Sequence, residues 1–487
     1  MSGLSKSKTP SYVLTLRLET EIHQEHKLFK RFELARNIYN ACLGELYKRY
    51  STLKQSKRYK TICKMEKGKQ RNKMFLELNK EFGLAEYSLH EFVRPMQHQF
   101  KQNIDSFTSQ KIATRAFKAF EKVIYKQGKK VRYKKHGEMH SLEGKTNSTG
   151  IRYKDGHIIW NGLVLRTIIK KNDVYAHLAL RDKIKFVRIK RERFKGKYVY
   201  YAQLVLDGLP PRKYNTEGIK DKNSTEKRVG IDIGTSTVAV CSESEVILTE
   251  LAPSVADLGQ KIKNIQRAMD RSKRAMNPAK YKEDGTIDTS NRASWVFSKR
   301  YMKKKNQLNE WQRLNRMKRK QDHEILSNRI LSLGTMVIVE TMSFKGLQKR
   351  AKETKVNEKG KFNNKKRFGR TIGNRAPSML LNIIERKLNY TNNSMKRANT
   401  SLLKASQYNH VTDTYEKKKL HQRWNDFGFC KIQRDLYSAF LLMNCKENLE
   451  EIDRELCKQN FERFREKHDL EIQALKGKEK TPVSMGV

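Results

Sequence analysis

Apolar and polar residues alternate along residues 12–18 (YVLTLRL), a pattern typical of a β-strand with one buried face. The pattern changes to a helical period along residues 29–50 (FKRFELARNIYNACLGELYKRY). The apolar residues of that segment fall on one helical face: Phe32, Ala35, Ile38, Tyr39, Cys42, Leu43 and Leu46. A further helical pattern (SQKIATRAFKAFEKVI) ends at Ile124. These patterns predict one strand followed by a helical region.

Strand patterns return between residues 181 and 206, where the sequence FKGKY predicts the turn of a hairpin. Together with the first strand, they predict a small β-barrel or sheet, split between 1–20 and 126–207. The helical region at 21–125 would be an insertion in that barrel. Residues 208–228 are polar, contain two prolines and have no periodicity, so we expect a linker there.

After the linker the pattern is that of an α/β domain, expected to span 229–448. Strands are expected near 229–240, 246–250 and 335–340, and helices near 256–275, 295–332, 377–390 and 432–444. Residues 349–375 are basic, rich in Gly and Asn and without apolar periodicity, which predicts a mobile loop inserted in the domain. Residues 449–487 are predicted to form a charged, mostly helical tail that frays at its end.

Composition points to a polyanionic partner. The chain of 487 residues has 104 Lys and Arg against 52 Asp and Glu, a formal net charge of +52. Such an excess suits the phosphate backbone of nucleic acid, because each neutralised phosphate releases bound counterions. A membrane surface is the alternative, but we find no 18-residue apolar run and no lipidation motif. The absence of an apolar signal core and of CxxC pairs among six cysteines predicts a cytoplasmic, nucleoid-associated protein.

Three carboxylates lie within or at the ends of predicted apolar elements. Asp232 interrupts the apolar strand VGIDIG, Glu340 ends the apolar run MVIVE, and Asp435 opens an amphipathic helix. Each alone has an ordinary explanation: a turn cap, a surface ion pair, or an acid favoured by the helix dipole. A carboxylate inside an apolar strand, however, costs several kcal/mol unless it is paired or holds a metal ion.

Taken together, these acids predict a metal-dependent site. The order strand Asp, strand Glu, helix Asp suits two divalent ions about 3.5–4 Å apart, one activating water and the other stabilising a leaving 3′ oxygen. Carboxylate oxygens are ligands that Mg²⁺ prefers. We therefore expect two Mg²⁺ ions held by Asp232, Glu340 and Asp435.

At these residues the sequence resembles the TnpB family, transposon-encoded RNA-guided nucleases related to the compact type V CRISPR effectors. VGIDIG, VIVETMSFKGL and QRDLYSAF are similar to the three RuvC motifs of that family, and YVLTLRL with FELARNIYN is similar to its N-terminal region. The resemblance covers most of the chain, more loosely between about residues 50 and 180. It implies a RuvC-like nuclease domain of the RNase H fold, joined to a wedge-type β-barrel with a helical recognition insertion. Asp232, Glu340 and Asp435 would be the catalytic triad.

The resemblance also implies partners: a guide RNA and target double-stranded DNA beside a short flanking motif. The guide would come from a transposon end or from a CRISPR array, and both remain open. One departure concerns residues 406–431, where many members of the family have a four-cysteine zinc ribbon. This segment offers only His410, His421 and Cys430, at spacings that do not form paired knuckles, so zinc is not expected.

Basic residues in three segments are predicted to contact nucleic acid. They are Lys303, Lys304, Arg313 and Arg316 in a long helix, Lys365, Lys366, Arg367 and Arg370 in the basic loop, and Arg423 in the zinc-ribbon-like segment.

Other functional classes fit less well. The stretch DIGTST resembles the phosphate turn of actin-like and sugar-kinase ATPases, but the chain has no GG dipeptide for an adenosine site, and that class does not explain its charge. An Asp-Asp-Glu transposase would place its Glu last, on a helix. A guided repressor that has lost cleavage is the closer alternative, although all three acids are present.

Overall fold

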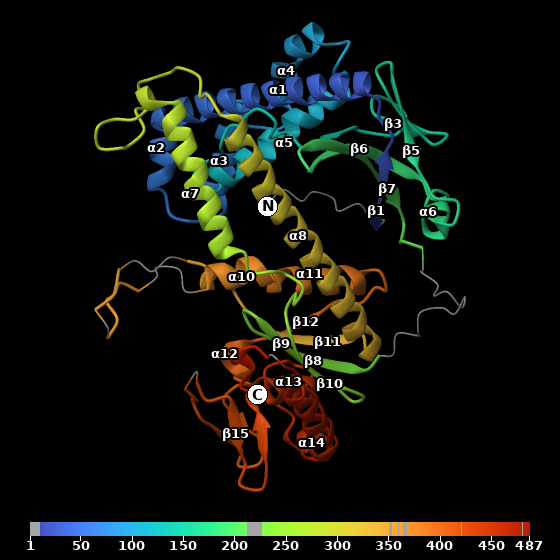
Figure 1. Ribbon diagram of the computed structural model, residues 1–487, viewed down its shortest axis with the longest axis vertical. Helices are drawn as coiled ribbons and strands as arrows, with labels where there is room; N and C mark the ends of the chain where they lie inside the picture. Colours follow the sequence, from blue (N-terminus) through green and yellow to red (C-terminus); the bar gives the residue numbers. More distant parts are fainter. Residues whose placement is uncertain are drawn as a thin grey trace. The chain divides into compact units, whose positions relative to one another are not determined.

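The computed structural model describes residues 10–211, 226–349, 353–358, 360–363, 368–419, 421–479 and 481–487. The chain divides into two compact units, Met1–Lys213 and Tyr214–Val487 (Figure 1). Among the described residues no helix combines the length and the apolar character that a membrane crossing needs.

A curled sheet forms the β part of the first unit, with described strands in the order β2-β6-β7-β1-β5-β4-β3. Strand β1 alternates exposed and buried side chains, as the sequence predicts, and pairs antiparallel with β5 and β7. The strands are β1 (Ser11–Leu18), β2 (Ser141–Glu143), β3 (Arg152–Lys154), β4 (His157–Trp160), β5 (Leu163–Ile168), β6 (Ile184–Phe194) and β7 (Lys197–Asp207). The predicted hairpin is confirmed as β6 and β7, which meet at Lys195 and Gly196, both with positive φ.

Helices separate β1 from its partner strands in the sequence and pack onto the same core. They are α1 (Ile22–Gln55), α2 (Lys57–Lys64), α3 (Lys69–Glu81), α4 (Ser88–Gln99) and α5 (Ser106–Ile124), with the short α6 (Val174–Ala179) following β5. The apolar face predicted for α1 is buried at every named position. One hydrophobic cluster contains buried residues of both the sheet and the helices. The sheet and the inserted helices therefore share one hydrophobic core in the described part of this unit.

The second unit is built on a five-stranded sheet in the order β10-β9-β8-β11-β12. Strands β8 (Arg228–Ile233), β9 (Thr237–Ser242) and β10 (Val246–Glu250) are antiparallel, whereas β11 (Met336–Glu340) and β12 (Lys396–Ala398) run parallel to β8. The strands match the predicted positions, except that the run at 229–240 is two strands joined by a turn. Most of the predicted linker, residues 212–225, lies outside the described residues.

Helices cover both faces of this sheet (Figure 1). One face packs on α8 (Lys299–Leu333) and α11 (Pro377–Asn389), and the other on α13 (Arg434–Met443) and α14 (Arg454–Lys476). The remaining helices are α7 (Gly259–Met276), α9 (Phe344–Leu347), α10 (Gly369–Arg375) and α12 (Thr400–Leu403), with 3-10 turns at Pro278–Lys280 and Val483–Met485. Short hairpins pair β13 (Tyr408–Asn409) with β14 (Thr414–Tyr415) and β15 (Trp424–Asp426) with β16 (Lys431–Gln433).

The segment predicted as a charged, mostly helical tail contains a long helix that packs on the domain. Helix α14 fills much of 449–487 and buries Cys457, Phe461, Phe464, His468, Ile472 and Leu475 against α13 and the sheet. The spacing of three and four residues between these side chains makes an apolar stripe that the surrounding charges obscure in the sequence. The predicted mobile loop at 349–375 likewise ends in helix α10, whose Asn374 carbonyl accepts a hydrogen bond from Arg319 of α8.

Candidate functional site

The alternation of side chains along β8 and β11 puts two of the predicted acids on one face of the sheet. In β8, Val229, Ile231 and Ile233 belong to the hydrophobic cluster that contains α8 and α11 residues. Asp232 therefore points to the opposite face, toward α13. In β11, Val337 and Val339 likewise face the α8 side, which leaves Glu340 on the α13 side.

The register of the two strands brings these acids together. Strands β8 and β11 are parallel, and Val339 is paired with Ile231. Asp232 and Glu340 are the next residues along, so both emerge where the two strands end. Each residue is partly buried and keeps some exposed surface.

Helix α13, which packs on this face of the sheet, adds the third acid. Asp435 lies in its first turn, and the helix packs on β8 and β9. The close approach depends on Gly230, because a Cβ there would collide with the backbone of α13 at Ala439 and lie 2.5 Å from the Met443 nitrogen. The sequence VGID thus supplies an acid and, two residues earlier on the same face, the space that the helix needs.

The other two acids act electrostatically on Asp232. Burial, then the neighbouring charges of Asp435 and Glu340, raise the pKa of Asp232 well above its usual range, while Arg434 acts in the opposite direction. Burial also raises the pKa of Glu340, against a hydrogen bond from the backbone of Ala405. The Oε1 atom of Glu340 is buried and has no hydrogen-bond partner among the described residues. A site that crowds three acids and leaves a carboxylate oxygen unpaired is suited to a cation.

Asp435 is the acid with cationic partners. Its Oδ1 lies 3.4 Å from a guanidinium nitrogen of Arg434, and its Oδ2 lies 3.8 Å from one of Arg423. Both contacts are longer than a good charge-assisted hydrogen bond, and both arginines are partly exposed. These arginines place positive charge next to the Asp435 carboxylate.

The donor set fits Mg²⁺ in chemistry, because all three groups are carboxylates and one oxygen is unpaired. The three acids do not form a complete set of metal ligands in this structure, however. Within the described ranges, no group of three or more His, Cys, Asp or Glu side chains lies in a metal-binding arrangement. Asp435 is instead in contact with two arginines, Arg434 and Arg423.

The start of α13 is fixed by residues that the sequence analysis did not single out. The side chain of Gln433, fully buried, accepts a hydrogen bond from the Leu436 amide at 2.8 Å and donates one to the Met485 carbonyl at 2.9 Å. Its backbone N–H donates to Nε2 of His468 on α14 at 3.0 Å. Asp435 is therefore oriented by a cap that depends on the segment after residue 449. In the sequence, the signal for this cap is a polar residue, Gln433, immediately before Arg434 and Asp435.

The turn between β8 and β9 uses its own polar groups. The Gly234 amide donates to the Thr237 carbonyl at 2.9 Å, and the Ser236 carbonyl accepts from Leu251 at 2.8 Å. The Ser236 hydroxyl lies 3.2 Å from that of Ser484. The Gly234 amide is thus engaged inside the hairpin, and this favours the carboxylate interpretation of VGIDIG over a phosphate turn.

The predicted nucleic-acid residues are dispersed. Arg423 lies at the acid site, as described above. Arg370 is paired with Asp257, and Arg313 with Glu310 at 2.7 Å, so these two charges are already partnered. Lys303, Lys304 and Arg316 lie on α8, and at about 1.5 Å per residue Lys303 is about 45 Å from the C-terminal end of that helix. Lys365, Lys366 and Arg367 lie outside the described residues.

The zinc-ribbon-like segment is held by aromatic packing. His410 is buried, and its ring lies 4.7 Å from that of Phe461 between ring centroids. Its Nδ1 lies 2.7 Å from the Tyr437 hydroxyl. Burial and the nearby Arg454 and Lys458 lower the pKa of His410 to about 4. His410 thus acts as a neutral core residue that ties this segment to α13.

No protein-family model matches the chain, and no curated protein matches it. Solved structures similar to it include the following two. One is a Cas12f1–sgRNA–target DNA complex, with 10% identity, 90% of this chain and 99% of that chain covered, and a TM-score of 0.38. The other is a CRISPR–Cas12f ternary complex, with 10% identity, 87% and 82% covered, and a TM-score of 0.26. At these identities and scores the likeness assigns neither a family nor a function to the chain.

Proposed function

We propose that this chain is an RNA-guided DNA endonuclease that hydrolyses phosphodiester bonds with Mg²⁺ at Asp232, Glu340 and Asp435. The observation that carries the proposal is the convergence of these acids from β8, β11 and α13, with the Glu340 Oε1 unpaired within the described structure. A net charge of +52 supports a nucleic acid as the substrate.

The topology of the second unit supports the RuvC-like class. If the strands β8, β9, β10, β11 and β12 are numbered 1 to 5 along the chain, their order across the sheet is 3-2-1-4-5. Strands 1 to 3 are antiparallel to their neighbours in this series, and strands 4 and 5 run parallel to strand 1. This is the arrangement expected of an RNase H-like sheet, in which the first strand carries the first acid. The guided mode of action rests on the resemblance of the three motifs to those of TnpB proteins.

The chain's own residues would perform distinct tasks at the site. Asp232 and Glu340 would present carboxylate oxygens at the ends of adjacent strands, and Asp435 would add a third carboxylate from the first turn of α13. Arg423 and Arg434 lie against Asp435, where their charges suit a phosphate oxygen of the substrate strand. The ion, when bound, supplies an activated water and stabilises the leaving oxygen.

The first test compares Asp232→Ala with Asp426→Ala. Asp426 is an exposed acid on β15, so its removal makes the same chemical change away from the site. We expect Asp232→Ala to abolish Mg²⁺-dependent cleavage of target DNA while RNA binding is retained, and Asp426→Ala to cleave as the wild type does. Undiminished cutting by Asp232→Ala would refute the triad.

A second test concerns the guide. The protein is purified from cells that contain its native locus, and the RNA bound to it is sequenced. A discrete RNA that ends in sequence beside a transposon indicates a TnpB-type guide, and a repeat-spacer product indicates a CRISPR guide. If no RNA is enriched, the guided part of the proposal fails. Specific guided binding without cleavage by the wild type would instead establish the repressor alternative.

A further inference from the structure

Helix α5 carries four cationic side chains at the spacing of one helical face: Lys111, Arg115, Lys118 and Lys122. Intervals of four, three and four residues align them along the helix. Two cavities open beside this cationic stripe, one polar and one aromatic. Both lie within the first unit, so they are independent of the acid site.

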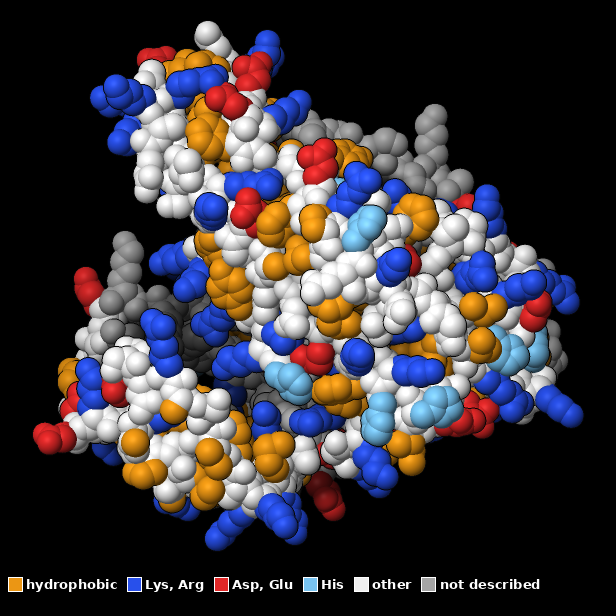
Figure 2. Space-filling model, turned by 90° about the horizontal axis from the view of Figure 1, so that it is seen from above, with side chains coloured by type: hydrophobic (Ala, Val, Ile, Leu, Met, Phe, Trp, Pro, Cys, Tyr) orange, Lys and Arg blue, Asp and Glu red, His pale blue; other side chains and the backbone are white. Residues whose placement is uncertain are grey.

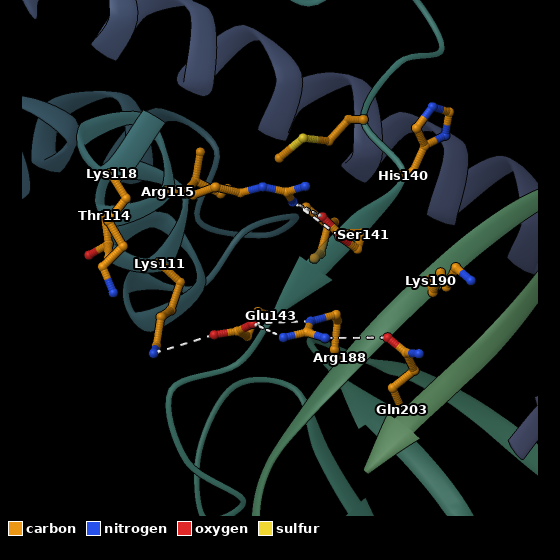
Figure 3. A pocket seen from close by; sticks show the side chains of 13 residues that line it. Lys111, Thr114, Arg115, Lys118, His140, Ser141, Glu143, Arg188, Lys190 and Gln203 are labelled. Carbon is orange, nitrogen blue, oxygen red and sulfur yellow. Dashed lines mark hydrogen bonds and ion pairs between the residues drawn. The ribbon is translucent and has the colours of Figure 1, made fainter. Parts of the chain in front are cut away.

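The polar cavity has a volume of about 500 Å³ and lies between α5 and the strands β2, β6 and β7. Figure 3 shows Lys111, Arg115 and Lys118 on the α5 side and Arg188 and Lys190 on the strand side. These five cations face a single carboxylate among the described lining residues, that of Glu143.

Ion pairs compensate only part of this positive charge. Glu143 is shared by Arg188 at 2.6 Å and Lys111 at 3.4 Å, and Lys190 is paired with Glu192 at 2.6 Å. Arg115 donates to the Ser141 carbonyl at 2.9 Å, a neutral acceptor that leaves its charge uncompensated. Lys118 is exposed and has no hydrogen bond or ion pair among the described residues. Positive charge without carboxylate partners, around a polar hollow, suits phosphate groups.

The aromatic cavity has a volume of about 810 Å³ and different chemistry. Its lining includes the rings of Tyr50, Tyr59, Phe75 and Tyr125 and the side-chain amides of Asn72, Asn79 and Gln127. The rings of Tyr59 and Phe75 meet edge to face at 5.7 Å, and Tyr125 remains 52% exposed. Rings and amides together suit a nucleobase, which presents a flat π-face and a hydrogen-bonding edge.

Arg71 adds an unpaired donor to this cavity. Its guanidinium lies 5.5 Å from the Phe75 ring centroid, and its Nε is buried without a hydrogen-bond partner in the described structure. A buried donor of this kind costs free energy until an acceptor reaches it. A base or a phosphate oxygen that enters the cavity would supply that acceptor.

Lys118 lines both cavities, which therefore adjoin along α5. We propose that a single strand of nucleic acid runs along α5, with its phosphates on the cationic stripe and an unpaired base in the aromatic cavity. From Lys111 to Lys122 the stripe is about 16 Å long at 1.5 Å per residue, which suits a few nucleotides. A duplex does not meet both requirements, because its bases are stacked and paired inside the helix.

This inference rests on the nucleic-acid partner of the proposed function, and its test uses binding alone. Fluorescently labelled oligonucleotides of one sequence, made as RNA and as DNA, are titrated with the full chain at several salt concentrations. A preference for RNA or for DNA identifies the sugar of the bound strand. Such a preference and equal binding of the two strands both support the inference. Equal competition by unlabelled duplex, or by polyglutamate at the same charge concentration, would overturn it.

Two pairs of variants locate the contacts. For the stripe, Lys118→Gln/Lys122→Gln is compared with Lys57→Gln/Lys60→Gln, which changes two exposed lysines of α2 outside both cavities. The stripe variant should flatten the slope of log K against log salt by about 1.4, because each lost phosphate contact to a single strand accounts for about 0.7. The α2 variant should leave the slope unchanged.

For the base, Tyr125→Ala is compared with Tyr87→Ala, which removes a ring that is 78% exposed on the same unit. Loss of one stacked base should weaken binding about 5- to 150-fold for Tyr125→Ala only. An abasic site in the oligonucleotide should remove that difference. If the wild type binds strands and all four variants equal it, the inference fails while the proposed function stands. If the wild type binds no nucleic acid, both fail.

Discussion

Gly230 of β8 lies directly against Ala439 of α13, and only the missing side chain permits this approach. A Cβ on Gly230 would overlap the Ala439 carbonyl oxygen. Gly230 is two residues from Asp232 on the same face of the strand, and Ala439 is one helical turn from Asp435. The separation of two of the predicted catalytic acids is therefore set by a backbone contact.

Replacing Gly230 with alanine should move α13 away from the sheet. Because the clash is with backbone atoms, which cannot rotate aside, we expect a loss of about 3 kcal/mol in the free energy of unfolding and loss of cleavage. Gly373→Ala in α10 is the matched control, since nothing lies within 4 Å of a Cβ there, and it should be neutral or stabilising. Denaturant unfolding monitored by circular dichroism measures both. Similar stability of the two variants would contradict the packing argument.

Glu340→Gln separates stability from activity. The folded protein raises the pKa of Glu340 through burial, so the ionised form destabilises the fold as pH rises through the folded pKa. The amide removes this charge, and we expect a higher melting temperature at pH 7 in EDTA. Cleavage should fall by more than about 100-fold, as for loss of a metal ligand. Glu450→Gln, at an exposed position, should change neither. A lower melting temperature for Glu340→Gln would argue that a partner holds its charge.

His410 predicts a pH dependence of stability. Its pKa falls from about 6.5 to about 4 on folding, so the unfolded chain binds the proton first as pH drops. The stabilisation is complete above pH 6.5 and is lost progressively toward pH 4, by about 3 kcal/mol. His410→Phe keeps a ring in the aromatic cluster but cannot titrate. Urea unfolding at pH 7, 5.5 and 4.5 should show a smaller loss for this variant, and equal losses would contradict the assignment.

Asp232 and Glu340 could be selected as candidates from the sequence, because a carboxylate in or at the end of an apolar strand costs free energy unless it is paired or binds a metal ion. Their catalytic role stays a prediction. The strand positions followed from continuous apolar runs, as in MVIVE. The sequence predicts that the three acids lie near one another, but it does not give their relative positions. These depend on the register of β8 against β11, whose paired residues are about 110 positions apart.

Other features could not be predicted for physical reasons. Helix α14 was taken for a tail because its apolar stripe is diluted by charges that face solvent. The contact of Gly230 with α13 depends on backbone proximity, which no single-sequence pattern encodes. The ion pairs of Arg370 and Arg313 could not be predicted, because their partners Asp257 and Glu310 are chosen by the fold and by local helix spacing, and the nucleic-acid contacts of these residues stay a prediction. The cationic stripe of α5 was overlooked because its lysines are interleaved with an ordinary amphipathic pattern.

The buried cap at Gln433 gives the last prediction. Its side chain holds the first turn of α13, and so the direction of Asp435, through hydrogen bonds to Leu436 and Met485. Gln433→Ala should cost about 1 kcal/mol of stability, as for other helix caps, and should also lower kcat about 10- to 100-fold with little change in KM. Asp453→Ala is the matched control, because Asp453 caps α14 through the Leu456 amide without touching the acids. It should lose similar stability and keep its kcat when assayed well below its melting temperature. Equal kcat for the two variants would show that the cap serves the fold alone, whereas a loss confined to Gln433→Ala would place this residue among those that position Asp435.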